Sequence, residues 1–233
     1  MNLTPFTIPV FNSRVKKIDR YVTQTEAIQR DVLKRLVGEA SNTEWGIKHN
    51  YSGIKQYEQF AASVGIQDYE TLKGDIDRMR RGERDVLWKG CCKWFAKSSG
   101  TTNDKSKFIP VTPDGLQRVH YKGGYDVVAT YLVNNPKSRL FTGKALILGG
   151  SHSPNYNLQN SLVGDLSSIL IENCSPIVNM MRVPKKEIAL LSDFEEKMDK
   201  IARSTCNKNV TNLSGVPSWM MALPKDLSHS CCR

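Results

Sequence analysis

The residues best suited to chemistry form one loop, Lys97–Lys107, with the sequence Lys-Ser-Ser-Gly-Thr-Thr-Asn-Asp-Lys-Ser-Lys. Small hydroxyl side chains and a glycine let backbone N–H groups approach an oxyanion closely, and the hydroxyls add further donors. The lysines Lys97, Lys105 and Lys107 can offset negative charge. These residue types favour binding of phosphate. A solvated hairpin loop has the same composition, so the loop residues alone leave both interpretations open.

The loop differs from the two most familiar phosphate motifs. Gly100 is its only glycine and no Gly-Lys-Ser/Thr follows, so the pattern GxxxxGK[ST] is absent, as is GxGxxG. A second fragment, Gly150-Ser151-His152, contains a nucleophile and a base but lacks the GxSxG pattern and a defined acid partner. We therefore expect no hydrolase site there.

The loop must be positioned by two strands, because short apolar runs flank it at 94–96 and 108–111. Similar runs follow at 145–148, 168–171 and 209–213, and they alternate with helical segments. This alternation is typical of an α/β fold.

Helical spacing dominates the part of the chain before Val86. Apolar positions recur with a helical period over 13–37, with Gly38 as a stop signal, and further helices are expected over 54–64 and 68–81. The first 85 residues are therefore predicted to be mostly helical.

Two further helices are predicted after the loop. Thr112-Pro113 has the pattern of a helix start, and the helix should continue to Asn134, with a kink or a close backbone approach at Gly123-Gly124. Ser192-Asp193-Phe194-Glu195 fits a capping box that opens another helix.

Positive charge is concentrated around the loop. The 233-residue chain has a formal net charge of +10, and residues 91–144, with nine basic and three acidic side chains, supply +6 of it. This indicates an anionic partner. A nucleic-acid binder more often spreads basic residues along a face with interleaved aromatic residues, and no nucleic-acid module is recognisable. We expect no nucleic-acid partner and keep that function as the least favoured alternative.

The cysteines indicate a reducing compartment. The six cysteines contain no CxxC pair and the four histidines are scattered, so we expect reduced thiols and no metal site. The chain starts without a signal-peptide pattern and has no apolar run of membrane-spanning length. We expect a cytoplasmic protein with no membrane partner.

The loop resembles the phosphate loop of the auxin-responsive acyl-acid amido synthetases, including their bacterial-type members. Their pattern is Ser-Ser-Gly-Thr-Ser/Thr-x-Gly-x-x-Lys, and this chain has Ser98-Ser99-Gly100-Thr101-Thr102 followed by Lys107. Asp104 stands where the pattern has its second glycine. The family belongs to the adenylate-forming superfamily of acyl-CoA synthetases and luciferases.

Segments on both sides of the loop extend the resemblance over nearly the whole chain: Thr43-Glu44-Trp45-Gly46, Tyr69-Glu70, Gly149-Gly150-Ser151-His152 and Gly215-Val216-Pro217-Ser218-Trp219-Met220. The resemblance implies part of the N-terminal domain of the adenylate-forming (acyl-CoA synthetase/luciferase-like) fold. We expect a helical N-terminal segment at 1–85 and a mixed β-sheet with flanking helices at 86–222. An atypical tail is expected at 223–233, where the family sequence is expected to be truncated.

The resemblance also implies a reaction. Members of the family use ATP and Mg²⁺ to activate a carboxylic acid as its acyl-adenylate, and then pass the acyl group to an amine or amino acid. It implies that hydroxyls of Ser98, Ser99, Thr101 and Thr102 donate to ATP phosphates and that Gly100 allows close approach. Lys107 matches the family lysine, and the charge and proximity of Lys105 suggest that it assists. Lys97 is expected to be a surface residue at a strand end.

The remaining family motifs are absent from these 233 residues. No Tyr-x-x-Ser/Thr-Glu motif for adenine occurs, and neither Gly74-Asp75 nor Gly164-Asp165 has the context of the ribose motif, so both are expected to be turns. No catalytic residue or metal ligand is therefore assigned. The leading hypothesis is an adenylate-forming ligase whose other catalytic parts lie beyond residue 233. The alternative is a non-catalytic remnant or a nucleotide-binding or interaction module.

Overall fold

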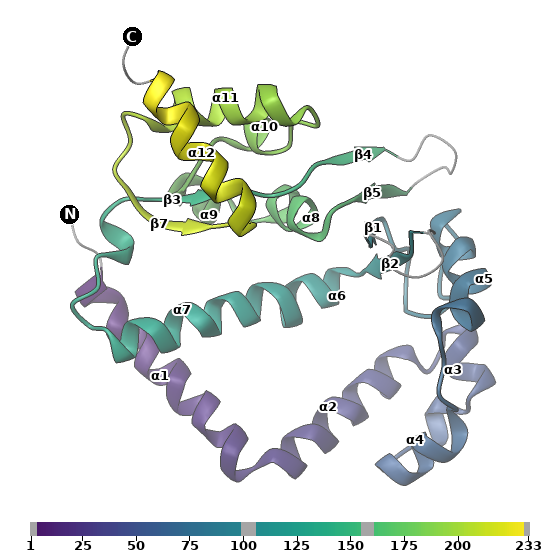
Figure 1. Cartoon of the computed structure of the whole chain (residues 1–233). Coiled ribbons are helices and arrows are strands. Elements are labelled where there is room, and N and C mark those ends of the chain that lie inside the picture. The colour runs from purple at the N-terminus through teal and green to yellow at the C-terminus, as the bar shows by residue number, and fades with distance from the viewer. Residues whose placement is uncertain (1–3, 99–105, 155–160, 231–233) are drawn as a thin grey trace. The chain divides into compact units, whose positions relative to one another are not determined.

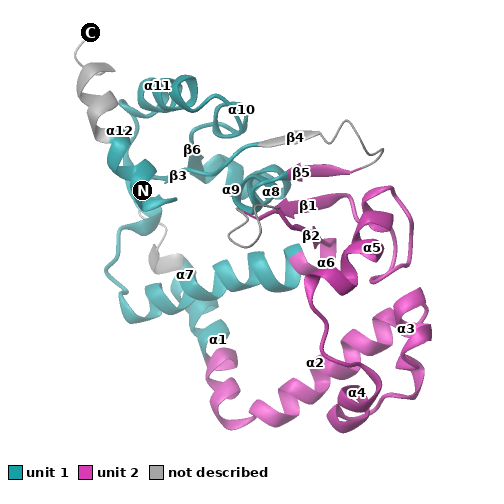
Figure 2. Ribbon diagram, turned by 45° about the vertical axis from the view of Figure 1, so that its right-hand side comes forward, with its two compact units in different colours: residues 1–15, 116–153, 164–233 teal, residues 16–115, 154–163 magenta. Residues whose placement is uncertain are grey.

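The computed structural model describes residues 4–98, 106–154 and 161–230 (Figure 1). The chain forms two compact units (Figure 2). Unit 1 contains residues 1–15, 116–153 and 164–233, and unit 2 contains residues 16–115 and 154–163. These units interleave along the chain. The segments predicted from the sequence, 1–85, 86–222 and 223–233, instead follow one another, and this division into segments stays a prediction.

Residues 4–80 are largely helical. The helices are α1 (Thr4–Thr23), α2 (Thr25–Ala40), α3 (Glu44–Lys48), α4 (Tyr57–Ser63) and α5 (Tyr69–Arg80), with a 3₁₀ turn η1 (Tyr51–Gly53). This confirms the helices expected within 54–64 and 68–81. Gly74-Asp75 lies inside α5, so the expected turn there is wrong.

The single helix predicted over 13–37 is wrong, because the helix breaks at Gln24. Gln24 has φ −127° and ψ 27°, and its side chain accepts hydrogen bonds from Arg20. The Thr25 hydroxyl donates to the carbonyl of Tyr21. Such local side-chain bonds compete with regular helix geometry. The stop expected at Gly38 is also misplaced, since α2 continues to Ala40.

Polar side chains fix the starts of the later helices in unit 2. Thr43 accepts a hydrogen bond from the Gly46 N–H at 2.9 Å and so caps α3. Asp68 accepts one from the Thr71 N–H at 2.8 Å and forms a capping box at the start of α5. Each cap satisfies backbone donors that the first turn of a helix leaves unpaired.

The sheet of unit 2 is built around an antiparallel hairpin. Strands β1 (Trp94–Lys97) and β2 (Phe108–Val111) pair so that Trp94 lies opposite Val111 and Lys97 opposite Phe108. The strand order is β2-β1-β5-β4, where β5 is Leu162–Gly164 and β4 is His152–Pro154. The division into units falls within β4 and β5, since residues 116–153 and 164–233 belong to unit 1. The strands predicted at 94–96 and 108–111 are confirmed. Beneath the hairpin lies an apolar cluster of Ile76, Met79, Val86, Cys92 and Phe95.

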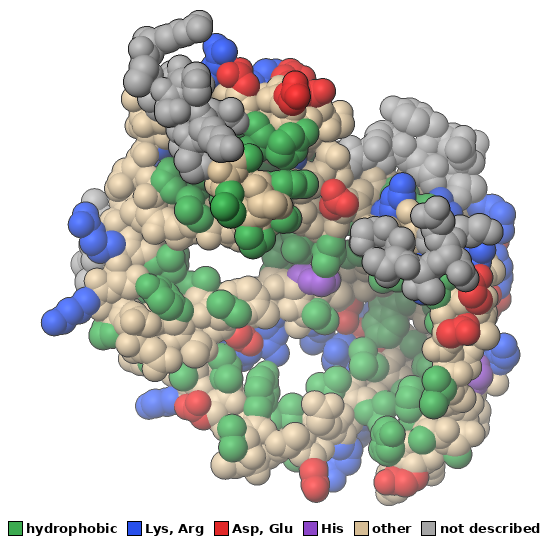
Figure 3. Space-filling view, viewed as in Figure 1, with side chains coloured by type: hydrophobic (Ala, Val, Ile, Leu, Met, Phe, Trp, Pro, Cys, Tyr) green, Lys and Arg blue, Asp and Glu red, His purple; other side chains and the backbone are tan. Residues whose placement is uncertain are grey.

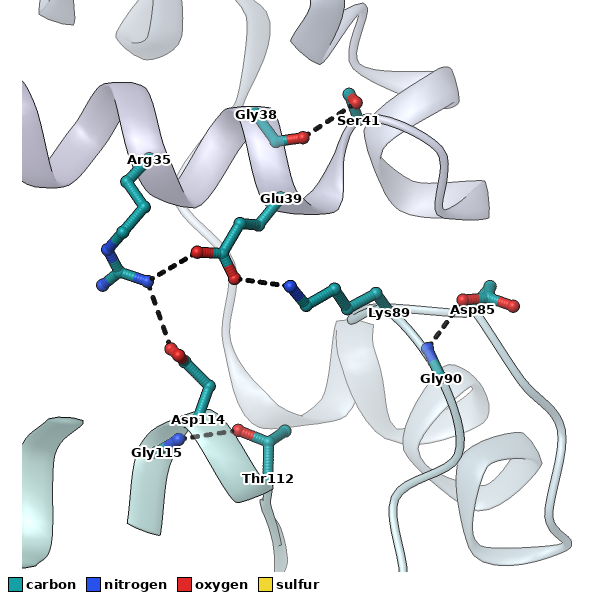
Figure 4. Close-up of polar contacts among 10 residues, drawn as sticks. All are labelled: Arg35, Gly38, Glu39, Ser41, Asp85, Lys89, Gly90, Thr112, Asp114 and Gly115. Carbon is teal, nitrogen blue, oxygen red and sulfur yellow. Dashed lines mark hydrogen bonds and ion pairs between the residues drawn. The ribbon is translucent and has the colours of Figure 1, made fainter. Parts of the chain in front are cut away.

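A polar network joins α2 to two later segments of unit 2 (Figure 4). Arg35 contacts Glu39 and Asp114, both at 3.2 Å, and Lys89 reaches the other oxygen of Glu39 at 2.8 Å. Asp114 belongs to α6 (Pro113–Gly115). The hydrogen bond from Lys89, and then that from Arg35, lower the pKa of Glu39. The Glu39 carboxylate therefore stays ionised between two cations. Glu39 joins α2 to the segment of Lys89, and Arg35 joins α2 to Asp114.

Unit 1 contains a parallel sheet in the order β6-β3-β7. The strands are β3 (Lys144–Ile147), β6 (Arg182–Val183) and β7 (Val210–Ser214). The accompanying helices and turns are η2 (Leu116–Tyr121), α7 (Lys122–Asn134), η3 (Leu140–Thr142), α8 (Leu166–Asn173), α9 (Pro176–Met181), α10 (Lys186–Ala189), α11 (Phe194–Thr205) and α12 (Pro217–Ser230). The strands expected at 145–148 and 209–213 are confirmed, and the α/β fold class with them.

The core of unit 1 packs the sheet against α11. It includes Leu146, Leu148, Met198, Ile201 and Ala202, all buried. Hydrophobic side chains also gather on the surface over β7 and the described turns of α12 (Figure 3), where Leu213, Val216 and Met221 are exposed. Part of the apolar surface of this unit therefore lies outside its core.

The strand predicted at 168–171 is wrong, because these residues lie in α8. The backbone N–H groups of Ser168 and Ile169 both donate to the carbonyl of Asp165, which precedes the helix. A four-residue apolar run fits a buried strand or a buried helix equally well, and tertiary contacts choose between them. Asp165 is the N-cap position, so the expected turn at Gly164-Asp165 becomes a helix start.

The helix expected from Pro113 to Asn134 forms, with an irregularity earlier than predicted. Residues Leu116–Tyr121 take π-helical geometry, whereas Gly123 and Gly124 lie in regular helix. A Cβ added at either glycine would meet no atom within 4 Å, so close backbone packing does not explain them. Within the described ranges, the structure contains no helix with both the length and the apolar character needed to cross a membrane.

Two glycines of unit 2 provide a matched test of this packing. Gly46→Ala places a Cβ 2.0 Å from the backbone carbonyl oxygen of Ala40, so we expect the free energy of unfolding to fall by about 2 kcal/mol. Gly38→Ala lies in α2 with open space around it, and should raise the same quantity by about 0.5–1 kcal/mol. Urea unfolding of both variants measures the difference, and equal effects would contradict the packing described.

Candidate functional site

The candidate site is the hairpin between β1 and β2. Ser98 follows β1 directly and Lys107 directly precedes β2. The backbone N–H of Ser98 donates to the carbonyl of Lys107 at 2.9 Å, and the backbone N–H of Lys107 donates to the Ser98 hydroxyl at 3.1 Å. We call this pair of residues the loop neck. It closes the loop at its base and fixes where the intervening residues leave and rejoin the sheet.

Five of the seven predicted phosphate-binding residues lie outside the described residues: Ser99, Gly100, Thr101, Thr102 and Lys105. Their roles stay predictions. The structure describes Ser98 and Lys107 and brings them together at the loop neck. Lys97, which the sequence predicts to be a surface residue, is exposed at the end of β1.

Tyr69, the first residue of α5, contacts the start of β2. The Phe108 N–H donates to the Tyr69 hydroxyl at 3.0 Å. The Nζ of Lys107 lies 5.5 Å from the centroid of the Tyr69 ring, within the range of a cation–π contact. Tyr69 therefore contacts both the backbone and the side chain at the end of the loop.

The charge of Lys107 acts on the carboxylate of Asp68, the residue that precedes α5. Hydrogen bonds from the Thr71 backbone and hydroxyl lower the pKa of Asp68, and the charge of Lys107 lowers it further. Asp68 is already engaged as the cap of α5, and within the described ranges no salt bridge involves Lys107. The ammonium of Lys107 is thus not neutralised by an ion pair there.

A second cation supports the hairpin from within the core. The Arg80 guanidinium lies 3.7 Å from the centroid of the Phe108 ring and contacts Asp77 at 3.1 Å. Arg80 is 9% exposed. This stacking fixes Phe108, the residue next to Lys107, against α5.

Unit 1 contains a buried lysine that the sequence patterns did not mark as a site. Lys197 of α11 is 4% exposed, and its Nζ donates to the carbonyls of Gly149 at 2.6 Å and Gly150 at 3.0 Å. Burial lowers the pKa of Lys197, and the nearby charge of Asp165 partly opposes this. One signal was available in the sequence, because Lys197 falls on the face of α11 that includes the buried Ile201.

Gly150 is closely packed. The Gly150 N–H donates to the Ser167 hydroxyl at 2.9 Å, and a Cβ at Gly150 would lie 1.8 Å from an oxygen of Asp165. The glycine is required because Asp165 approaches so closely. Within the described ranges, no group of three or more His, Cys, Asp or Glu side chains is arranged to hold a metal ion.

Comparison with known proteins identifies the family. The family model described as the GH3 family N-terminal domain matches residues 14–231. The chain belongs to the GH3 family. The match extends over both units and includes most of the tail that the sequence predicts to be atypical.

Curated relatives of this GH3 chain are plant enzymes. It is 30% identical over 106 residues to an indole-3-acetic acid-amido synthetase GH3.8 of Oryza sativa subsp. indica, covering 45% of the chain and 18% of the relative. It is 28% identical over 116 residues to indole-3-acetic acid-amido synthetase GH3.4 of Arabidopsis thaliana, covering 49% and 19%. The chain thus matches about a fifth of the length of these relatives.

Solved structures show the same fold. A GH3.15 acyl acid amido synthetase superposes with a TM-score of 0.71 at 22% identity, over 92% of this chain and 38% of that one. A complex of AtGH3.15 acyl acid amido synthetase with 2,4-DB gives a TM-score of 0.73 at 20% identity, over 97% and 39%. The GH3 chain therefore has part of the adenylate-forming fold, as the sequence predicts.

Ser98→Ala tests the loop neck. Removal of the hydroxyl deletes the acceptor for the Lys107 N–H, so this amide should exchange its hydrogen about five-fold faster, as expected for a net loss of ~1 kcal/mol. Hydrogen exchange followed by NMR measures the rate. Ser52→Ala, at an exposed serine of unit 2, is the control and should leave the Lys107 rate unchanged. An unchanged rate in Ser98→Ala would show that the hydroxyl does not hold the neck.

Lys197→Met tests the buried ammonium through pH. Because the pKa of Lys197 is lowered in the folded chain, the unfolded chain binds more protons below the ordinary value of 10.5. Wild-type stability should therefore rise relative to that of Lys197→Met as the pH approaches 10.5 from neutral. Urea unfolding across this range measures it. The control is Lys200→Met, at an exposed lysine of the same helix, and parallel profiles for wild type and Lys197→Met would refute the effect of burial.

Proposed function

We propose that this GH3 chain binds the phosphates of ATP at the loop 98–107, as part of a ligase that adenylates a carboxylic acid and conjugates it to an amine or amino acid. The observation that carries the proposal is the loop neck, which brings Ser98 and Lys107 together at the base of the loop. Among the residues that the structure describes, the Lys107 ammonium contacts the ring of Tyr69 and forms no salt bridge. The printed names of the relatives, amido synthetases for indole-3-acetic acid and for acyl acids, support the reaction class.

The chemistry explains why such a loop is needed. A carboxylate is a poor electrophile. In adenylation its oxygen bonds to the α-phosphorus of ATP, the bond from that phosphorus to the bridging oxygen breaks, and pyrophosphate leaves. The amine then bonds to the acyl carbon and AMP leaves. Donors fixed around the β- and γ-phosphates hold the leaving group in line and offset its growing charge.

The residues present fit a triphosphate. We assign the hydroxyls of Ser98, Ser99, Thr101 and Thr102 as donors to phosphate oxygens, Gly100 as the point of closest approach, and Lys105 and Lys107 as the positive charges. The described residues bring together no carboxylate set for a metal, so no residue is assigned to Mg²⁺ and no step is derived through it. We propose the cytoplasm as the location, since Cys91, Cys92, Cys174 and Cys206 are free thiols.

A second candidate function is a nucleotide-binding module without turnover. The same loop neck would serve this function, since it could hold phosphate without a later chemical step. ATP–pyrophosphate exchange with a panel of carboxylic acids separates the two. Exchange that depends on an acid identifies the ligase, whereas binding of ATP without exchange identifies the module.

Lys107→Met tests the site itself. The loss of a charge-assisted contact to phosphate should weaken binding of ATP with Mg²⁺ about ten-fold or more. Titration calorimetry on the 233-residue chain measures the affinity. Lys97→Met removes the same charge from the exposed end of β1 and should change the affinity less than two-fold after salt screening. Equal losses in the two variants would mean that the general positive field, and not Lys107, binds the nucleotide.

A further inference from the structure

Tyr69 contacts Lys107 and the residue after it, at the end of the loop. It lies 39 residues before Phe108, yet its hydroxyl accepts the Phe108 N–H at 3.0 Å and its ring lies 5.5 Å from the Nζ of Lys107. The ring is half-buried and packs against the apolar cluster beneath the hairpin. Tyr69 is therefore held by the core of unit 2 while its outer atoms contact the end of the loop.

The chemistry of these contacts suits a phosphate-binding lysine. A free lysine side chain samples many rotamers, and ordering it when a ligand binds costs conformational entropy. A carboxylate partner would order the side chain but would also neutralise it and compete with phosphate. An aromatic face restricts the ammonium through a weak contact and leaves its charge available. The carboxylate of Asp68, on which the charge of Lys107 acts, is engaged by Thr71 in the capping box of α5.

We propose that Tyr69 is a positioning residue for the phosphate loop. Its hydroxyl fixes the backbone where the loop rejoins β2, and its ring holds the Lys107 ammonium beside the loop until a phosphate group replaces the ring as partner. The proposal rests on the proposed function, because it assigns Tyr69 a role in presenting Lys107 to the nucleotide.

Two substitutions separate positioning from ordinary packing. Tyr69→Phe keeps the ring and removes the hydroxyl, and Tyr69→Leu keeps an apolar side chain and removes both. The matched control is Tyr57→Leu, since Tyr57 is the first residue of α4 as Tyr69 is of α5, and is 68% exposed. A purely structural role predicts changes in unfolding alone, with no change at Lys107.

The readout is the NMR spectrum of Lys107 together with affinity for ATP and Mg²⁺. The ring should shift the ε-methylene protons of Lys107 upfield in the wild type and in Tyr69→Phe, and this shift should vanish in Tyr69→Leu. Tyr69→Leu should weaken ATP binding about two- to five-fold, the range of an exposed cation–π contact. Tyr69→Phe should make the Phe108 amide exchange about five-fold faster. Tyr57→Leu should change none of these.

The outcomes are distinguishable. If Lys107→Met weakens ATP binding but Tyr69→Leu changes neither the affinity nor the Lys107 shift, the positioning role is overturned and the proposed function stands. If the wild type binds no ATP, both fall. If Tyr69→Leu does not fold, Tyr69→Phe decides: an unchanged exchange rate at Phe108, or a missing ring-current shift at Lys107, overturns the proposal.

Discussion

The closure of the β1–β2 hairpin at Ser98 and Lys107 is the contact on which the candidate site depends. The backbone bond extends the pairing of the two strands by one step, and the Ser98 hydroxyl adds a second bond in the opposite direction. The position of these two residues sets where the loop 98–107 begins and ends. The hairpin in turn rests on α5, through the stacking of Arg80 on Phe108 and the hydrogen bond to Tyr69. A helix that contains no loop residue thereby becomes part of the site.

The positive charge of the chain divides into a structural part and an available part. Arg80, Arg182 and Lys197 are buried. Arg80 contacts the Phe108 ring and the Asp77 carboxylate. Arg182 donates to the Asn179 side-chain amide and the Pro184 carbonyl, and Lys197 donates to the carbonyls of Gly149 and Gly150. All three lie outside residues 91–144, the segment with the largest excess of basic residues. The excess around the loop is thus not explained by these buried cations, which strengthens its connection to an anionic ligand.

Membership of the GH3 family and the superposition on acyl acid amido synthetases agree with the resemblance seen in the loop itself. In the structure, several of the segments that extend the resemblance on either side of the loop make defined contacts. Thr43 and Gly46 form a cap and a close approach at α3, Tyr69 supports the loop, and Gly149 and Gly150 accept the Lys197 ammonium at their carbonyls. Each of these short segments supplies a particular contact.

The sequence by itself determined the features that depend on neighbours along the chain. The helix start at Asp68, the two strands around the loop and the loop motif could all be predicted, because each depends on residues a few positions apart. The capping box expected at Ser192–Glu195 is displaced by one residue, since Asp193 caps α11 by accepting a hydrogen bond from the Glu196 N–H. Tertiary structure decided the rest. The apolar run at 168–171 lies in the helix α8. The contact of Tyr69 with Phe108 spans 39 residues, and that of Lys197 with Gly149 spans 48. No local spacing encodes such contacts, because they form only when packing brings distant segments together and excludes the alternatives that a short run leaves open.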